Sequence, residues 1–263
     1  MRSLLDATKP YIDRFKGIRI STRPDAIDDD VLALLKSYKT TAVELGAQSM
    51  CDAVLSANDR GHTADDVRSA AVLIQRYDME LGLQMMTGLY QSTDALDRYT
   101  AEEFIRLHPS TVRIYPTIVM RGTRLGELYE TGTYAPQTLD EAVALCAELL
   151  PLFAENGVKV IRVGLHDTDT LRRDMLAGPY HPAFRELCES RIMLRKAFAL
   201  LQDKPSGAYT LAVNPRCRSK LTGNQKSNLI ALEKQGYTIR ITEDPQIPDS
   251  EINVLTEQNS SDS

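Results

Sequence analysis

Short apolar runs alternate with amphipathic stretches from the N-terminus to Leu165. Five runs, rich in β-branched and aliphatic residues, have the length of buried strands: Gly17–Ser21, Ala42–Gly46, Leu81–Met86, Val112–Tyr115 and Val158–Leu165. Between them, helical periodicity covers Asp28–Tyr38, Ala64–Tyr77, Thr93–Leu107 and Leu139–Asn156. Strands separated by single helices form right-handed βαβ units, so the pattern predicts an α/β fold with a parallel sheet.

After Leu165 the pattern changes. Residues 166–177 are polar and are predicted to form a loop, and Pro182 suits the first turn of a helix over Ala183–Leu201. Further strands are expected at Ala208–Asn214, Tyr237–Thr242 and Ile252–Leu255, with a helix near Asn224–Gln235. We therefore expect a first domain over residues 1–166, a small α/β appendage over 167–255 and a disordered tail over 256–263.

The first expected strand, Gly17–Ser21, is as apolar as an interior strand. In a parallel sheet such a strand is expected to have neighbours on both sides, because a bare apolar edge invites association with other chains. The pattern therefore predicts a sheet whose first strands precede Met1.

One polar side chain lies between apolar neighbours in each expected strand: Arg19, Glu44, Gln84, Arg113 and Arg162. Strands of a parallel sheet are buried on both faces, so polar groups within them need partners or a ligand. If the strands lie side by side, we expect these side chains in about one layer, whose net positive charge needs an anion or an extended buried network. The alternative is that the three arginines point outward to helix carboxylates, since alternation alone does not assign the inward face.

A second polar set follows the expected strands at their carboxyl ends, where α/β proteins bind ligands. It consists of Ser21, Thr22, Arg23, Gln48, Ser49, Thr87, Gly88, Tyr115, Gly164 and His166. These groups suit a polar ligand that carries hydroxyl and carboxylate groups. The sequence shows neither a persuasive nucleophile–base pair nor a glycine-rich phosphate loop.

Composition narrows the class of protein. The 263 residues carry a formal charge of −5, with 43% hydrophobic and 25% charged residues, which is typical of a globular chain. No apolar stretch approaches the roughly 20 residues of a membrane span, and the N-terminus lacks the apolar core of a secretory signal. The four cysteines lack the short spacing of a metal knuckle or redox pair. We therefore expect a cytoplasmic protein with reduced thiols that does not bind membranes.

Six motifs carry a family resemblance through their order and spacing: Ile18–Asp25, Val43–Ser49, Arg60–Thr63, Gly82–Leu89, Arg113–Thr117 and Gly178–Phe184. Together they resemble the radical S-adenosylmethionine (SAM) superfamily, in the branch of the Elongator catalytic subunit and the oxygen-independent coproporphyrinogen oxidases. The resemblance covers nearly the whole chain to about Leu194. It implies a partial parallel (β/α) barrel with SAM across the carboxyl ends of the strands.

The resemblance also implies a cofactor site. SAM contacts are implied for Ser21, Gln48, Arg60 and Gln84, and the same motifs carry Arg23, Glu44 and Arg113. Ser21 stands where relatives often carry a carboxylate. In an intact family member, an iron–sulfur cluster holds and reductively cleaves SAM, and the adenosyl radical abstracts hydrogen from a substrate such as an RNA or a tetrapyrrole.

One family feature is absent from the sequence. The 4Fe–4S cluster of the family is held by a Cys-xxx-Cys-xx-Cys triplet after the first strand, and this chain has no such triplet. The family order places Ile18–Ser21 at the third strand. We therefore interpret the chain as the carboxyl-terminal, truncated portion of an Elongator-like radical SAM protein, with no metal site and no turnover of its own. A natural relative that lacks the cluster is the alternative.

Other functions remain open from the sequence. A binding module without chemistry would meet RNA through four cations of the appendage, Arg216, Arg218, Lys220 and Lys226, although a solvated loop explains them as well. A hydrolase built on Glu44 would need a second carboxylate, and pairing with Arg19 or Arg113 is the simpler explanation. His166 and His181 lack the spacing of metal ligands.

Overall fold

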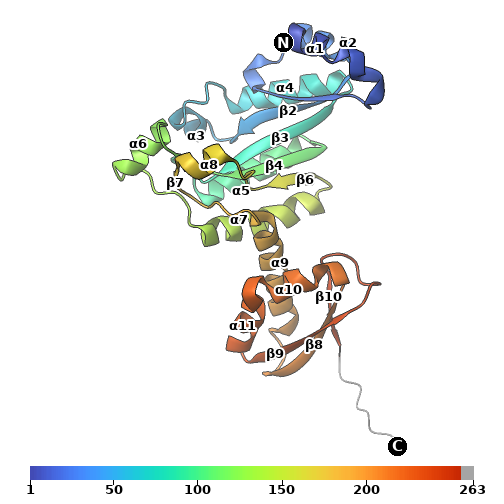
Figure 1. Ribbon diagram of the computed structural model, residues 1–263, viewed down its shortest axis with the longest axis vertical. Helices are drawn as coiled ribbons and strands as arrows, with labels where there is room; N and C mark the ends of the chain where they lie inside the picture. The colour runs from blue at the N-terminus through green and yellow to red at the C-terminus, as the bar shows by residue number, and fades with distance from the viewer. Residues whose placement is uncertain (256–263) are drawn as a thin grey trace, which may run out of the picture. The chain divides into compact units, whose positions relative to one another are not determined.

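The computed structural model describes residues 1–255 and divides the chain into two compact units between Pro182 and Ala183 (Figure 1). The expected tail, 256–263, lies outside the described residues. The division falls later than the expected boundary at residue 166, because the segment after the last strand of the first sheet folds back onto the first unit. No helix among residues 1–255 is long and apolar enough to cross a membrane.

The first unit is built on a five-stranded parallel sheet with the order β1-β2-β3-β4-β6. The strands are β1 (Ile18–Thr22), β2 (Thr40–Gln48), β3 (Glu80–Thr87), β4 (Thr111–Pro116) and β6 (Lys159–Val163). All five match the predicted runs, and the predicted parallel sheet is confirmed. Within residues 1–255 the sheet is open, with β1 and β6 at its two margins, as expected of a partial barrel.

Helices follow the strands as the βαβ pattern predicts. The longer ones are α2 (Asp29–Ser37), α4 (Ala64–Arg76), α5 (Asp94–Arg106) and α7 (Leu139–Glu155), and the shorter ones are α1 (Arg2–Asp6), α3 (Asp52–Ala57) and α6 (Arg124–Glu130). Helix α4 packs on β2 and β3, α5 on β3, and α7 on β6. Thr63 and Thr138 begin α4 and α7 with reciprocal capping boxes, which satisfy backbone N–H groups of the first turn.

The two faces of the sheet differ in chemistry because side chains alternate along each strand. Val43, Leu45, Leu83 and Ile114 are fully buried or nearly so, and they alternate with polar residues that point the other way. We call the side that carries Arg19, Glu44, Gln84 and Arg113 the polar face.

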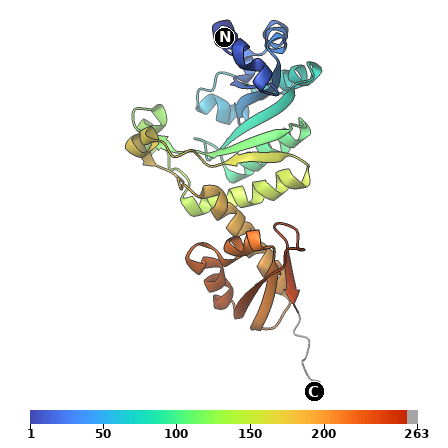
Figure 2. The same cartoon turned by 45° about the vertical axis from the view of Figure 1, so that its right-hand side comes forward.

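The segment 166–177, expected to be a loop, contains α8 (Asp169–Asp174) and β7 (Met175–Ala177). The Thr168 side chain caps α8, and β7 pairs antiparallel with the short strand β5 (Val119–Met120). Gly178 has a φ of +118°, and a Cβ there would lie 2.9 Å from Ile118 Cα, so this close return of the chain requires glycine. In Figures 1 and 2, α6 and α8 gather at the same end of the sheet.

The second unit is a small α/β domain in which helices pack on a three-stranded sheet. Its three-stranded sheet has the order β10-β8-β9, where β8 (Gly207–Val213) pairs parallel with β9 (Tyr237–Glu243) and antiparallel with β10 (Ile252–Leu255). Its helices are α9 (Phe184–Leu201), α10 (Arg218–Thr222) and α11 (Ser227–Lys234). The predicted strands and helices of this region are present, although α9 begins two residues after Pro182, with Ala183 as its N-cap.

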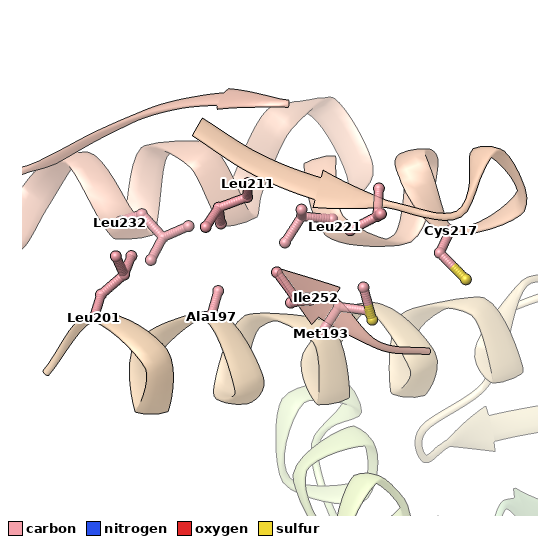
Figure 3. Packing of buried hydrophobic residues seen from close by; sticks show 9 residues of the cluster. Met193, Ala197, Leu201, Leu211, Cys217, Leu221, Leu232 and Ile252 are labelled. Atoms are coloured by element: carbon pink, nitrogen blue, oxygen red, sulfur yellow. The ribbon is translucent and has the colours of Figure 1, made fainter. Parts of the chain in front are cut away.

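The core of the second unit joins every one of these helices to the sheet (Figure 3). Met193, Ala197 and Leu201 line one side of α9. They face Leu211 on β8 and Leu232 on α11. The helix therefore presents residues one turn apart to the sheet, which is the spacing that an amphipathic helix provides.

Candidate functional site

Glu44 on β2 is the centre of a hydrogen-bond network on the polar face. Its side chain is only 2% exposed. Arg113 donates two hydrogen bonds to Glu44, from Nε to Oε2 at 2.8 Å and from Nη2 to Oε1 at 3.1 Å. Arg19 donates to Glu44 Oε1 at 3.0 Å, and Gln84 donates to Glu44 Oε2 at 2.9 Å. Arg19 and Arg113 therefore turn toward a strand carboxylate, and the alternative that they reach outward to helix carboxylates is wrong. We call these four residues the Glu44 network.

The predicted single layer of polar residues is wrong in its register. Glu44 pairs with Gly82 across the sheet, whereas Gln84 pairs with Arg113, and Arg113 with Arg162. The polar residues therefore occupy successive rungs of the sheet. Gly82 has no side chain, so Glu44 can extend over β3 and reach Arg113 on β4.

The network fixes the charge of its members. Burial opposes ionisation of Glu44, but the hydrogen bonds from Arg113, Gln84 and Arg19 outweigh it and hold the pKa of Glu44 below its usual value. The same carboxylate raises the pKa of Arg113. Glu44 is therefore a fixed anion near neutral pH and a poor proton donor, which argues against a general-acid role.

Ser21 on β1 joins the edge of the Glu44 network. Its hydroxyl donates to Glu44 Oε2 at 3.5 Å and accepts from Gln84 Nε2 at 3.3 Å. The structure thus brings together four of the sequence-predicted site residues, Ser21, Glu44, Gln84 and Arg113.

Arg60 belongs to a second cluster, in the loop before α4. Its guanidinium is half-buried, its Nε has no hydrogen-bond partner, and no ion pair joins it to another group within residues 1–255. Burial, and then the positive charge of Arg23, lower the pKa of Arg60. Arg23 itself is held by Asp25, with contacts of 2.8 and 2.6 Å. Arg60 is therefore a cation without an anionic partner in the part of the chain that the structure describes.

Gln48 ends β2 in an unusual conformation. Its φ is +65°, in the left-handed region that side chains disfavour, and the residue is 8% exposed. Strained backbone of this kind is often found at ligand sites. Nearby strand ends also hold two buried hydroxyls, of Thr87 and Thr117, that have no hydrogen-bond partner among residues 1–255. The carboxyl edge of the sheet therefore contains more polar groups than its own hydrogen bonds satisfy.

Asp97 on α5 is a buried carboxylate that was not among the residues predicted from the sequence pattern. This carboxylate is 2% exposed and accepts the backbone N–H of Gly88 at 2.8 Å and the Ser92 hydroxyl at 2.6 Å. Burial raises the pKa of Asp97 to about 6, against the effect of these hydrogen bonds. The Tyr134 hydroxyl donates to Gly88 O at 2.6 Å beside a cavity of about 360 Å³. An aspartate on the buried side of an amphipathic helix was the available signal.

The part of the chain that the structure describes contains no group of side chains arranged as metal ligands. No three His, Cys, Asp or Glu side chains among residues 1–255 converge to hold an ion. None of the four cysteines forms a disulfide within residues 1–255, and Cys146, Cys188 and Cys217 are buried. Among residues 1–255 these thiols do not converge as the three ligands of an iron–sulfur cluster would.

The cations expected to meet RNA are largely engaged within the second unit. Arg218 lies 3.2 Å from Glu243, Lys220 lies 2.9 Å from Glu189, and Arg216 lies 3.9 Å from Asp249. These pairs reduce the positive charge that the segment offers, and RNA binding through Arg216, Arg218, Lys220 and Lys226 stays a prediction.

Comparisons with known proteins find a matching family model and relatives of similar sequence. Residues 109–193 match the family model described as the Radical_SAM C-terminal domain. The tRNA uridine(34) acetyltransferase of Dehalococcoides mccartyi is 32% identical over 143 residues, which cover 53% of this chain and 31% of that protein. Elongator complex protein 3 of Dictyostelium discoideum is 31% identical over 179 residues, which cover 67% of this chain and 31% of that protein.

A solved structure agrees with these similarities. The archaeal Methanocaldococcus infernus Elp3 with an N-terminal deletion superposes with a TM-score of 0.63 at 25% identity, covering 69% of this chain and 42% of that one. The matched part of the chain spans about a third of the length of the two curated relatives. The range matched by the family model, 109–193, includes β4 and β6 of the first sheet.

Proposed function

This chain is an Elongator-like relative of the radical SAM proteins over the part of their length that it spans, and we propose that it binds S-adenosylmethionine at the carboxyl ends of β1, β2 and β3. The observation that carries the proposal is the half-buried guanidinium of Arg60, which has no anionic partner within residues 1–255. A desolvated cation of this kind costs free energy unless a ligand anion pairs with it.

The chemistry of SAM matches the groups gathered at this edge. The carboxylate of its methionine part suits Arg60, because a guanidinium binds carboxylates through paired N–H donors. The ribose hydroxyls suit amide and hydroxyl groups such as Gln48 and Ser21, which donate and accept hydrogen bonds. The Glu44 network supports the proposed SAM site, since the buried carboxylate holds the side chains of Gln84 and Ser21 in place by hydrogen bonds.

We further propose that these 263 residues bind SAM without cleaving it. Cleavage in the family requires a cluster held by three thiolates, and the sequence contains no Cys-xxx-Cys-xx-Cys triplet. The structure supports this because its cysteines do not converge within the described residues. No redox step is therefore assigned to the residues of this chain.

The proposed substrate class is a transfer RNA. The support comes from the relatives, two of which carry the printed names tRNA uridine(34) acetyltransferase and Elongator complex protein 3. A tetrapyrrole has no comparable support among the groups on the polar face, which are charged or hydrogen-bonding.

Equilibrium dialysis with radiolabelled SAM tests the cofactor site. We expect saturable binding by the wild-type chain and a loss of about tenfold or more in affinity for Arg60→Gln, because a charged hydrogen bond to the ligand is removed. Arg76→Gln is the matched control, since Arg76 ends α4, just before β3 begins, and so lies at the opposite edge of the sheet. Equal affinity of wild type and Arg60→Gln would contradict the site.

Anaerobic reconstitution with iron and sulfide, followed by reduction, tests the second half of the proposal. We expect SAM to be recovered intact. Cleavage of SAM by the reconstituted 263-residue chain would show that it holds a cluster by itself and would refute the proposed lack of turnover.

A further inference from the structure

The pairing of β4 with β6 places two arginines side by side. Val112 pairs with Val160, but the register shifts at the next residue, so that Arg113 pairs with Arg162. The extra residue on β6 is a bulge, and bulges commonly redirect a side chain near a binding site. Paired residues of neighbouring strands point to the same face, so Arg162 joins Arg113 on the polar face.

Only one of these two arginines is neutralised. Arg113 binds both oxygens of Glu44, and Arg19 shares Glu44 and also contacts Glu80 at 2.9 Å. Arg162 makes no ion pair within residues 1–255. Like charges directly opposite on a sheet are destabilising, so a bulge that creates such a pair calls for a compensating anion.

The one side-chain partner of Arg162 in the described chain is an imidazole rather than a carboxylate. Its Nη2 donates to His166 Nδ1 at 2.8 Å. Arginine has no acceptor, so Nδ1 must accept and the imidazole proton lies on Nε2. Gly164, with a φ of +83°, turns the chain after β6 and brings His166 back to Arg162.

We propose that Arg162 and His166 form a phosphate-binding subsite at the β6 margin of the polar face. The guanidinium keeps most of its N–H donors for a ligand, and His166 adds a further donor at Nε2. A tetrahedral oxyanion accepts from both groups at once, and it supplies the negative charge that Arg162 lacks within residues 1–255. This inference deepens the proposed function, on which it rests, because the phosphates of an RNA substrate would meet this subsite.

Titration of the isotope-labelled full chain with inorganic phosphate tests the subsite, at constant ionic strength because electrostatic binding depends on salt. We expect the His166 Nε2 resonance to move with saturation and to be unmoved by the same concentration of acetate. We expect Arg162→Gln to weaken phosphate binding about tenfold or more. Arg162→Lys keeps the charge without the fork of donors, and we expect it to lose about threefold.

Fluorescence anisotropy with a labelled single-stranded RNA distinguishes a phosphodiester ligand from a free phosphate. A loss of RNA affinity in Arg162→Gln but not in Arg76→Gln supports the phosphodiester. Phosphate binding without RNA binding supports a small phosphorylated ligand. Equal losses in both variants would show only general electrostatic attraction and would overturn the subsite.

Two further results would also overturn it: phosphate that leaves His166 unmoved, or acetate that competes equally. Arg162→Lys keeps these readings interpretable if Arg162→Gln folds poorly. SAM dialysis on the same samples separates the two proposals, because Arg162 variants should bind SAM as wild type does. Phosphate binding without SAM binding would sustain the subsite and refute the proposed cofactor.

Discussion

Gly82 lies beside Glu44 so closely that a Cβ added to the glycine would come within 2.6 Å of Glu44 Cγ and 3.1 Å of Thr111 Oγ1. The carboxylate at the centre of the polar face therefore depends on the missing side chain of the neighbouring strand. A strand glycine is normally unfavourable, so its presence here has a steric reason.

Gly82→Ala should displace Glu44 and loosen its bonds to Arg113 and Gln84. We expect a loss of about 1–3 kcal/mol in the free energy of unfolding, which is typical of overpacking, measured by urea denaturation. Gly207→Ala is the control, because the nearest atom to a Cβ there is 4.0 Å away. Similar losses in both variants would contradict the steric argument.

Glu44→Gln should remove the anion that two arginines share. We expect the free energy of unfolding at pH 7 to fall by about 3 kcal/mol, because breaking a buried pair leaves uncompensated charge. The pKa of Glu44 is lowered in the fold, so its contribution is present above its usual pKa and is lost as the pH falls through the lowered value. Urea denaturation at pH 7 and in acid should show a smaller acid loss in the variant; an unchanged acid loss would contradict it.

Asp97 should make the free energy of unfolding fall as the pH rises, which is the opposite of the effect of Glu44. The pKa of Asp97 rises from 3.8 in the unfolded chain to about 6 in the fold. The protonated carboxyl therefore contributes its full stabilisation of the fold below pH 3.8, and this contribution is lost as the pH rises through about 6. The shift corresponds to about 3 kcal/mol. Asp97→Asn cannot ionise, and the difference between wild type and variant across this window, followed by urea denaturation, should show the loss. A constant difference would refute the raised pKa.

Asn228 should hold the helices of the second unit together. Its buried Nδ2 lies 3.0 Å from Ser190 O on α9 and 3.0 Å from Lys220 O on α10. We expect Asn228→Ala to lower the free energy of unfolding by about 2 kcal/mol, because it removes the buried hydrogen bonds that this amide donates to α9 and α10. The exposed Asn253 on β10 provides a control, whose alanine variant should change stability by less than about 0.5 kcal/mol.

Much of the fold could be predicted from the sequence because alternation and helical periodicity depend on local pattern. The same alternation identified Glu44 and Arg113 as unusual, since buried polar residues need partners. Register was not predictable, because the bulge beside Arg113 depends on how two distant strands meet. The polar segment 166–177 was missed for a similar reason, since β7 forms only by pairing with β5.

The site was only partly predictable for a related reason. Sequence pattern places Arg60 and Gln84 on loops and strands, but it does not show which groups already satisfy one another. The structure separates Gln84, which is held by Glu44, from Arg60, which lacks an anion within residues 1–255. Asp97 was missed because a single polar residue in an otherwise amphipathic helix is a weak pattern.

The open margin at β6 has a consequence for the size of what can bind. In the described chain β6 bonds only to β4, and Arg162 and His166 stand at that margin. A polymer bound across the strands could extend past β6 at this margin, because no closed barrel of strands surrounds it in the described chain. Oligonucleotides of increasing length should thus be admitted without an upper cut-off, in contrast to a closed cylinder whose bore would set one.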